Sequence, residues 1–231
     1  MYATAGQNGE TGAVSTSDTP QFPVFDLRIT TPRLELRPVR EADALALIDL
    51  ADRGIHDPGD MPFLVPWTEE ATPGRWWHSF QHYAGHWAGL RPESWTLSFA
   101  VLADGDLVGN QVAESEDFPT SRTAETGSWI GRGYQGRGYG YEARIAILTL
   151  LMDGLGALVA STGAWHDNAA SLRVTQKVGY EPNGEWLKPR RGVPTPSPRF
   201  RLTARAWAEV RPDLPVTISG LDAALPQLGL A

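Results

Sequence analysis

The sequence predicts an α+β fold in which helices are combined with a mostly antiparallel sheet. Leu34 and Leu36 alternate with charged residues, a period of two that indicates a half-buried strand. Apolar residues between positions 44 and 51 recur instead every three or four residues, as on one face of a helix. Two further alternating segments flank the pair Asp104-Gly105, which favours a tight turn between antiparallel strands.

The N-terminal half begins with one strand and two helices. We expect the strand at residues 34–37, where Pro38 ends it, and the first helix over 40–54, with Gly54 as its stop. Residues 56–72 contain three prolines and an apolar stretch, which indicates a loop that packs by its own side chains. A Trp-rich helix follows over 73–90.

The middle of the chain predicts three antiparallel strands and a helix. The hairpin strands cover residues 95–101 and 107–114, and a third strand covers 125–131. A glycine-rich turn then leads into a helix over 139–152.

The C-terminal part predicts a short strand, a helix and a strand pair. The short strand covers 158–162, and the helix lies between its N-cap Asn168 and Gly179. The closing strands, 180–186 and 200–204, flank a segment rich in Pro and Arg that we expect to be a loop.

Composition limits the function classes that remain open. With 20 Lys or Arg against 27 Asp or Glu, the net charge of −7 argues against nucleic acid as a partner. The absence of cysteine excludes disulfides, thiolate metal sites and a cysteine nucleophile. The first residues do not resemble a secretory signal, and the longest apolar stretch, near 145–152, is shorter than the ~20 residues that cross a bilayer. We therefore expect a cytoplasmic protein without a membrane partner.

The chain is expected to form one domain with two extensions. Residues 1–22 are rich in small polar residues without periodicity, which predicts a flexible tail. The domain is expected over 23–208, and 209–231 form a C-terminal extension.

The densest chemical signal is the turn at residues 131–140, which holds five glycines. Glycines allow close approach of the backbone, and a helix N-terminus attracts anions. Arg132 and Arg137 add positive charge in the turn. The turn therefore predicts a phosphate site rather than a mere connection.

Two interpretations of these glycines compete. Gly131, Gly133 and Gly136 satisfy the dinucleotide pattern of a nicotinamide-dependent oxidoreductase, but no acidic residue follows the next strand at the required spacing. A phosphate-loop NTPase lacks its Gly-Lys-Ser or Gly-Lys-Thr. The other pattern is Q-x-x-G-x-G, formed by Gln135 with Gly138 and Gly140.

With this second pattern, the sequence resembles the GNAT superfamily of N-acetyltransferases, in its RimJ/RimL-type branch. Four segments look like family segments in family order: TPRLELRPV at 31–39, AETGSWIG at 124–131, GYQGRGYGYEA at 133–143 and NAASLRVTQKVGYEPNG at 168–184. The resemblance implies a mixed, mostly antiparallel sheet with helices on both faces, whose splayed central strands hold acyl-CoA between them.

The resemblance also implies a set of cofactor-binding residues. The pantetheine arm would pair with the strand that enters the turn, as an added strand pairs with a sheet edge. The pyrophosphate would bind the N–H groups of the turn. The implied residues are Trp129, Ile130, Gly131, Gln135, Gly136, Arg137, Gly138, Tyr139, Gly140 and Asn168. Two of these have a plain alternative role, Arg137 as a solvated turn residue and Asn168 as a helix cap.

The implied reaction is transfer of an acetyl group from acetyl-CoA to a primary amine by direct attack in a ternary complex. A lysine-type amine has a pKa near 10, so a base must remove a proton at neutral pH. Glu125 is the first candidate and Glu114 the second, while Ser171 is the candidate proton donor to the leaving thiolate. A strand-end glutamate exposed to water is the alternative for Glu125, and a non-catalytic acyl-CoA-binding protein is the alternative function.

Three histidines, His78, His82 and His86, share one face of the Trp-rich helix. Because they span about 12 Å, one metal ion cannot meet all three, and we predict no metal. The resemblance implies that this helix and the loop before it border the amine acceptor, a small molecule or peptide. The side chains concerned either line that site or belong to an ordinary aromatic core; they are Phe63, Trp67, Trp76, Trp77 and His78.

Two further segments have open roles. The basic segment with Lys188, Arg190, Arg191, Arg199 and Arg201 either contacts CoA phosphates or an acidic acceptor, or is a solvated loop. The apolar C-terminal segment LDAALPQLGLA either serves a homodimer, the assembly that fits the resemblance, or covers the sheet.

Overall fold

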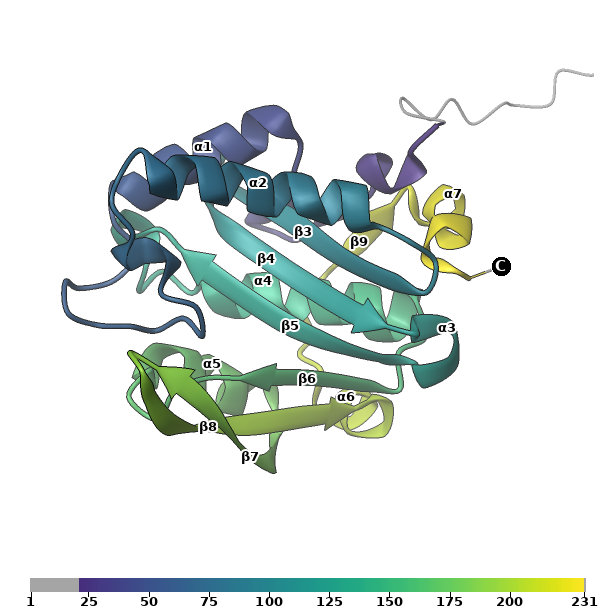
Figure 1. Ribbon diagram of the computed structural model, residues 1–231. Coiled ribbons are helices and arrows are strands. Elements are labelled where there is room, and N and C mark those ends of the chain that lie inside the picture. The colour runs from purple at the N-terminus through teal and green to yellow at the C-terminus, as the bar shows by residue number, and fades with distance from the viewer. Residues whose placement is uncertain (1–20, 231) are drawn as a thin grey trace, which may run out of the picture.

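The computed structural model describes residues 21–230. The tail expected at 1–22 thus falls almost entirely outside the described residues. Within them, the chain forms a nine-stranded sheet in the order β7-β8-β6-β5-β4-β3-β2-β1-β9 (Figure 1). The strands are β1 (Arg28–Thr30), β2 (Leu34–Pro38), β3 (Ser94–Ala103), β4 (Asp106–Glu116), β5 (Thr123–Ile130), β6 (Val159–Gly163), β7 (Glu181–Arg190), β8 (Val193–Thr203) and β9 (Thr217–Ser219).

Seven α-helices accompany the sheet in this part of the chain. They are α1 (Glu41–Asp52), α2 (Gly74–Gly89), α3 (Phe118–Ser121), α4 (Tyr139–Leu148), α5 (Ala169–Val178), α6 (Ala204–Val210) and α7 (Leu221–Ala224). In Figure 1, α1 and α2 cover one face of the sheet, and α4 and α5 lie behind it. The predicted α+β class, with a mostly antiparallel sheet between helices, is confirmed.

The sheet splays open at its centre. All neighbouring strands pair antiparallel except β5 and β6, which pair in parallel over only three residues, Thr123–Glu125 against Val159–Ser161. Beyond Glu125, β5 continues to Ile130 beside β4, while β6 diverges from it (Figure 1). This leaves one edge of β5 without a strand partner, which is the gap that the resemblance implies.

Two apolar clusters hold the layers together. Alternate residues of β3, including Leu97, Phe99 and Val101, point into the larger cluster with α4. Ala100 points to the opposite face, into a smaller cluster with Leu47 of α1. The period of two along β3 therefore provides one apolar face for each helical layer.

The prediction of a loop between the last two strands is wrong, because the residues of that segment form most of a β-hairpin. β7 and β8 turn at Arg191-Gly192, where both residues have positive φ. β6 pairs only with Arg199–Thr203 of β8, so residues 193–198 have a partner on one side. Pro194, Pro196 and Pro198 therefore occupy alternate positions whose missing N–H groups leave the β7 ladder intact.

Other boundaries differ more modestly. The helix expected over 139–152 is α-helical only to Leu148, and Thr149–Gly154 form a π-helical turn. The segment after residue 208 contributes β9, which pairs with β1 at the sheet edge. Ala224 and Leu228 of the apolar C-terminal segment are fully buried in the chain's own core. That segment therefore covers the sheet of its own chain.

Candidate active site

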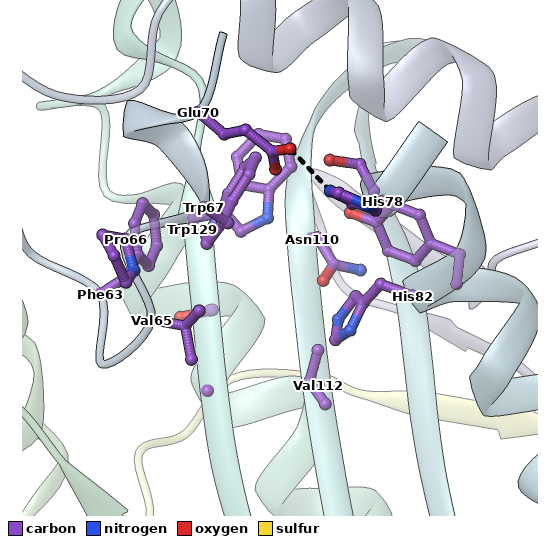
Figure 2. Close-up of a pocket in the computed structure, with 14 residues that line it drawn as sticks. Phe63, Val65, Pro66, Trp67, Glu70, His78, His82, Asn110, Val112 and Trp129 are labelled. Atoms are coloured by element: carbon purple, nitrogen blue, oxygen red, sulfur yellow. Dashed lines mark hydrogen bonds and ion pairs between the residues drawn. The ribbon is translucent and has the colours of Figure 1, made fainter. Parts of the chain in front are cut away.

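A cavity of about 680 Å³ lies over β4 and β5, beneath α2 and the preceding loop (Figure 2). We call residues 55–70 the cavity loop. The lining residues come from the cavity loop, α2 and the two strands; they are Phe63, Val65, Pro66, Trp67, Glu70, His78, Ser79, His82, Tyr83, Asn110, Val112, Gly127, Ser128 and Trp129. The cavity thus lies along the two strands that lead to the gap.

Three of the aromatic or histidine residues expected at the acceptor side line this cavity, and two do not. Phe63, Trp67 and His78 line it. Trp76 lies near the start of α2 and donates instead to Asp52 at the end of α1, and Trp77 is 62% exposed. The expectation for these two tryptophans is wrong, because Trp76 is held against α1 and the helical period turns Trp77 toward solvent.

The polar residues that line the cavity are Glu70, His78, Ser79, His82, Tyr83, Asn110 and Ser128. Asn110 is buried and donates from Nδ2 to Ser98 Oγ at 2.9 Å and to the Phe99 carbonyl at 2.8 Å, which fixes its amide. Glu70 Oε1 lies 2.7 Å from His78 Nδ1 at the rim (Figure 2). Sequence reasoning missed Asn110, because only the cross-strand register shows that it faces the cavity.

The other two histidines of α2 lie against each other, with ring centroids 4.3 Å apart. Burial lowers the pKa of His82, and burial together with His82 lowers the pKa of His86 to about 4. Both rings are therefore neutral at pH 7. Among residues 21–230, no group of three or more histidines and carboxylates is placed to hold a metal ion.

The glycine-rich turn joins β5 to α4 with the geometry that glycine permits. Gly136 and Gly138 have φ of +76° and +85°, and Gly138 is the N-cap of α4. A Cβ at Gly131 would lie 2.6 Å from Leu50 Cδ1, so close packing on α1 requires that glycine. Arg137 is exposed and its guanidinium lies over the Tyr134 ring. The first N–H groups of α4 thus face solvent at the end of the gap.

The buried carboxylate of Glu142 also holds the glycine-rich turn in place, through Arg33. Arg33 donates from Nη1 to the Arg137 carbonyl at 2.9 Å and lies over the Tyr139 ring. Its Nε donates to Glu142 Oε2 at 2.7 Å. Gly140 lies beside Ile130, so the helix begins against the end of β5.

The cavity loop bridges the two sides of the gap. On the β5 side, Gln135 donates from Nε2 to the Ile55 carbonyl at 2.6 Å and to the Ile130 carbonyl at 2.7 Å. On the β6 side, Asn168 caps α5 by accepting from the Ser171 N–H and donates to the Pro62 carbonyl at 3.4 Å. Two amides implied in cofactor binding therefore hold the loop in place.

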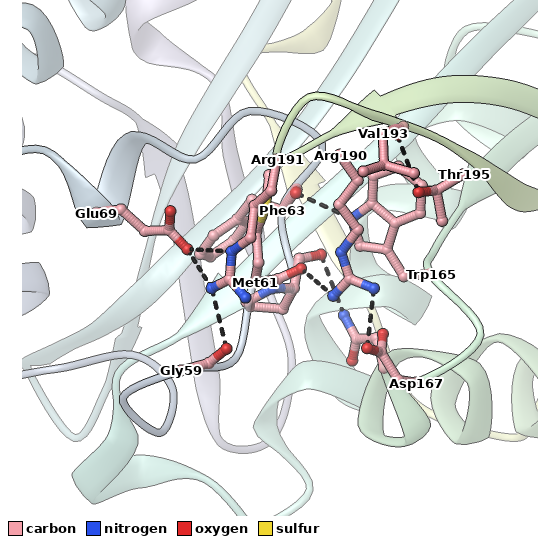
Figure 3. Close-up of polar contacts among 12 residues, drawn as sticks. Gly59, Met61, Phe63, Glu69, Trp165, Asp167, Arg190, Arg191, Val193 and Thr195 are labelled. Carbon is pink, nitrogen blue, oxygen red and sulfur yellow. Dashed lines mark hydrogen bonds and ion pairs between the residues drawn. The ribbon is translucent and has the colours of Figure 1, made fainter.

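The β7–β8 hairpin holds the same loop with two arginines (Figure 3). Arg190 donates to the Met61 carbonyl at 2.7 Å, and Arg191 donates to the Gly59 carbonyl at 3.0 Å and to Glu69 at 2.5 Å. Trp165 adds a hydrogen bond to the Phe63 carbonyl. Two of the five residues of the basic segment thus hold the loop in place, which sequence reasoning did not foresee.

The candidate catalytic residues fall into two places. Glu125 and Glu114 are directly opposite each other on β5 and β4, one same-face position beyond Gly127 and Val112 of the cavity. Burial, followed by the charges of Glu125 and Glu116, raises the pKa of Glu114, and Lys188 opposes this. Arg199 Nη2 lies 3.8 Å from Glu125 Oε2. Ser171 lies across the gap in the first turn of α5.

Solved structures of acetyltransferases have the same fold as this chain at low sequence identity. Mycobacterium smegmatis RimJ in complex with CoA-disulfide is 20% identical, with a TM-score of 0.62 over 81% of this chain and 95% of that chain. RimL, a ribosomal L7/L12 α-N-protein acetyltransferase in complex with coenzyme A, is 17% identical, with a TM-score of 0.59 over 76% and 97%. A GCN5-related N-acetyltransferase from Brucella melitensis is 18% identical, with a TM-score of 0.63 over 80% and 81%.

The sequence also matches a family directly. Residues 33–181 match the acetyltransferase (GNAT) domain. This segment covers more than half of the chain and includes the splayed strands, the glycine-rich turn and the helix capped by Asn168. The chain therefore belongs to the GNAT acetyltransferase family, whose members transfer an acetyl group from acetyl-CoA.

Proposed function

We propose that this acetyltransferase acts on a primary amine, which attacks acetyl-CoA directly within a ternary complex. The observation that carries the proposal is the position of the cavity beside the gap. β5 loses its β6 partner directly after Glu125, and the cavity lies along the same part of β5, from Gly127 to Trp129. An acyl donor in the gap and an amine in the cavity would therefore meet over one strand.

The residues at the gap fit acetyl-CoA. Backbone groups alternate in direction along a strand, and the Thr126 carbonyl accepts a hydrogen bond from Thr162 Oγ1 of β6. The N–H and C=O groups of Ser128 therefore face the gap, where a pantetheine amide would pair with them. The N–H groups of Gly136–Gly140 would bind the pyrophosphate, with the exposed Arg137 as a charged contact.

Proton removal from the amine is assigned to the carboxylate pair. Glu125 is the proposed base, because it lies at the last paired position before the gap opens. Glu114 is the second candidate, since its raised pKa brings its basicity closer to that of an amine. Arg199 adds a positive charge beside this pair, with its Nη2 3.8 Å from Glu125 Oε2.

Two further groups act on the acetyl carbonyl oxygen and on the sulfur of the leaving CoA thiolate. A backbone N–H of β5 that faces the gap would donate to the carbonyl oxygen as negative charge develops on it. Ser171 is the proposed proton donor to the leaving thiolate, because the first turn of α5 borders the gap beside Asn168. Acetyl-CoA itself supplies the activated acyl group.

The test is a thiol-release assay with acetyl-CoA and a panel of primary amines. Glu125→Gln should lower kcat by about 100-fold, the usual contribution of a positioned base, without changing the dissociation constant of acetyl-CoA. Glu181→Gln, an exposed glutamate on β7, is the matched control and should leave kcat unchanged. An unchanged kcat in Glu125→Gln together with a large loss in Glu114→Gln would transfer the role to Glu114.

The alternative function, acyl-CoA binding without catalysis, gives a different result. In that case acetyl-CoA raises the melting temperature, and no amine in the panel releases CoA. A ligand at 100 times its dissociation constant stabilises a fold by about 2.7 kcal/mol, so binding is readily measured.

A further inference from the structure

We infer that the acceptor is a primary amine on a bulky aromatic or branched apolar skeleton, with no carboxylate and no second cation. This inference rests on the proposed transfer to an amine and specifies the class of amine. It depends on the size of the cavity, on its walls, on its few charges and on the way the cavity loop is held.

The walls of the cavity are mainly aromatic and aliphatic. Trp67 lies between Phe63 and Trp129, with ring centroids at 5.2 Å and 6.2 Å (Figure 2). Val65 of the loop and Val112 of β4 extend the apolar surface. Tilted rings at these spacings favour a further ring at their edges or faces. A volume of about 680 Å³ suits a small molecule with one or two rings.

The charges at the cavity exclude several other amines. Among the lining residues, Glu70 is the sole carboxylate, and it is already paired with His78. No lysine or arginine is among them, and His82 is neutral at pH 7 because burial lowers its pKa. A free amino acid would therefore leave its carboxylate without a cation. Glu114 and Glu125 lie beyond the cavity and are assigned to the reacting amine, so the second ammonium of a polyamine would find no unpaired anion among the lining residues.

The backbone around the cavity offers no place for an extended polypeptide. β4 pairs with β3 on one side and with β5 on the other, so its ladder is complete. The helix α2 adds a wall whose backbone groups bond within the helix. An extended peptide adds to a free strand edge; the free edge of β5 is assigned to the pantetheine arm in the proposed complex, and β4 and α2 provide none.

The loop that covers the cavity is held at the carbonyls of alternate residues. The carbonyls of Gly59, Met61 and Phe63 accept hydrogen bonds from Arg191, Arg190 and Trp165, respectively (Figure 3). Because these donors come from β8's hairpin and from the chain after β6, the loop position is set by distant segments. The cavity is therefore preformed and partly covered, which suits a compact ligand rather than a long chain.

The first experiment compares kcat/KM for matched amines with the wild-type protein and acetyl-CoA. Tryptamine is compared with tryptophan, which adds a carboxylate, with propylamine, which lacks the ring, with spermidine and with a hexapeptide that has a free α-amine. We expect tryptamine to exceed propylamine by at least about tenfold, since burial of one aromatic ring favours binding by that factor or more. It should exceed tryptophan and spermidine by a similar factor because each brings a charge without a partner, and the hexapeptide because the cavity is partly covered. Equal or higher values for spermidine, tryptophan or the peptide would overturn the inference.

The second experiment alters the wall. Trp67→Ala should lower kcat/KM for tryptamine by about tenfold and leave that for propylamine within about twofold. Trp77→Ala removes an exposed tryptophan of α2 that does not line the cavity, and should change neither. If Trp67→Ala fails to fold, Val112→Thr is the second variant. It makes the apolar surface of the cavity more polar with little change of shape, and it should lower kcat/KM for tryptamine severalfold. Equal effects on both amines would contradict the inference.

A failure of the proposed function gives a distinct pattern. If acetyl-CoA binds but no amine releases CoA, direct transfer to an amine is wrong. Calorimetric titration of tryptamine into the acetyl-CoA complex then tests the cavity alone. Binding that Trp67→Ala weakens supports the inference, and the absence of tryptamine binding overturns it.

Discussion

Glu142 is a buried carboxylate in the first turn of α4, with a side chain 4% exposed. Its Oε1 accepts from Thr31 Oγ1 at 2.6 Å and from the Arg33 N–H at 3.2 Å. Its Oε2 accepts from Arg33 Nε at 2.7 Å and lies 2.5 Å from Nη2. Because Arg33 also donates to the Arg137 carbonyl, this carboxylate ties β2 to the glycine-rich turn.

Glu142→Gln keeps the shape and removes the charge. The Gln carbonyl can keep the two Oε1 bonds, but its amide faces two guanidinium donors where Oε2 accepted. Two charge-assisted hydrogen bonds at about 1.5 kcal/mol each, the low value because the Arg33 side chain is half exposed, give a loss of about 3 kcal/mol. The favourable interaction with the helix dipole, about 0.5 kcal/mol, is lost as well. For a chain of this size, the combined loss of about 3.5 kcal/mol should lower the melting temperature by about 7–14 °C.

Urea unfolding followed by tryptophan fluorescence measures the change. The matched control is Glu41→Gln, an exposed glutamate in the first turn of α1, where the dipole alone predicts about 0.5 kcal/mol. We also expect KM for acetyl-CoA to rise in Glu142→Gln and to stay unchanged in Glu41→Gln. Losses of stability within about 0.5 kcal/mol of each other would refute the reasoning, since the buried network would then contribute nothing.

Three further predictions concern single positions. The contribution of His86 to the free energy of unfolding should be fully present above pH 6.5 and be lost between pH 6.5 and about 4, because the unfolded chain protonates this histidine at a higher pH than the folded chain does. Urea titrations at pH 7.5 and 5 should differ by about 1–2 kcal/mol from this cause, allowing for partial exposure, and His86→Gln should abolish that part of the difference. Gly136→Ala should cost about 1 kcal/mol in unfolding free energy because of its positive φ, whereas Gly133→Ala in the same turn, with ordinary φ and open space, should cost nothing; equal losses would contradict this. Arg191→Ala should change stability by less than about 1 kcal/mol, since its pair with Glu69 is exposed, yet raise KM for the amine severalfold by releasing the cavity loop; steady-state kinetics with unchanged KM would count against the clamp.

Local patterns predicted most of the strands and helices between residues 34 and 179. The Asp104-Gly105 turn is confirmed as the β3–β4 connection, with positive φ at both residues. The Q-x-x-G-x-G pattern predicted the correct family, because glycine spacing directly reflects backbone requirements that no other residue meets. Such features depend on neighbouring residues alone.

Local sequence patterns gave wrong or incomplete predictions where the structure of a segment depends on another segment that is distant in the sequence. The prolines of β8 read as a loop, yet they are compatible with a strand that has one neighbour at those positions. Trp76 and Trp77 resemble the lining residue Trp67 in type, and only the tertiary structure shows that Trp76 bonds to Asp52 of α1 and that Trp77 faces solvent. Asn110 looked like an ordinary strand residue until its register placed it on the cavity face.

The sequence by itself determined the α+β class, the glycine-rich turn and the acetyltransferase family, since these follow from periodicity and glycine spacing close along the chain. The tertiary structure decided the gap between β5 and β6, the facing carboxylates of Glu114 and Glu125, and the cavity. It also decided the clamp of Arg190 and Arg191 on a loop more than 100 residues earlier. The physical reason is that these features depend on strand register and on long-range contacts, whose partners no local pattern encodes.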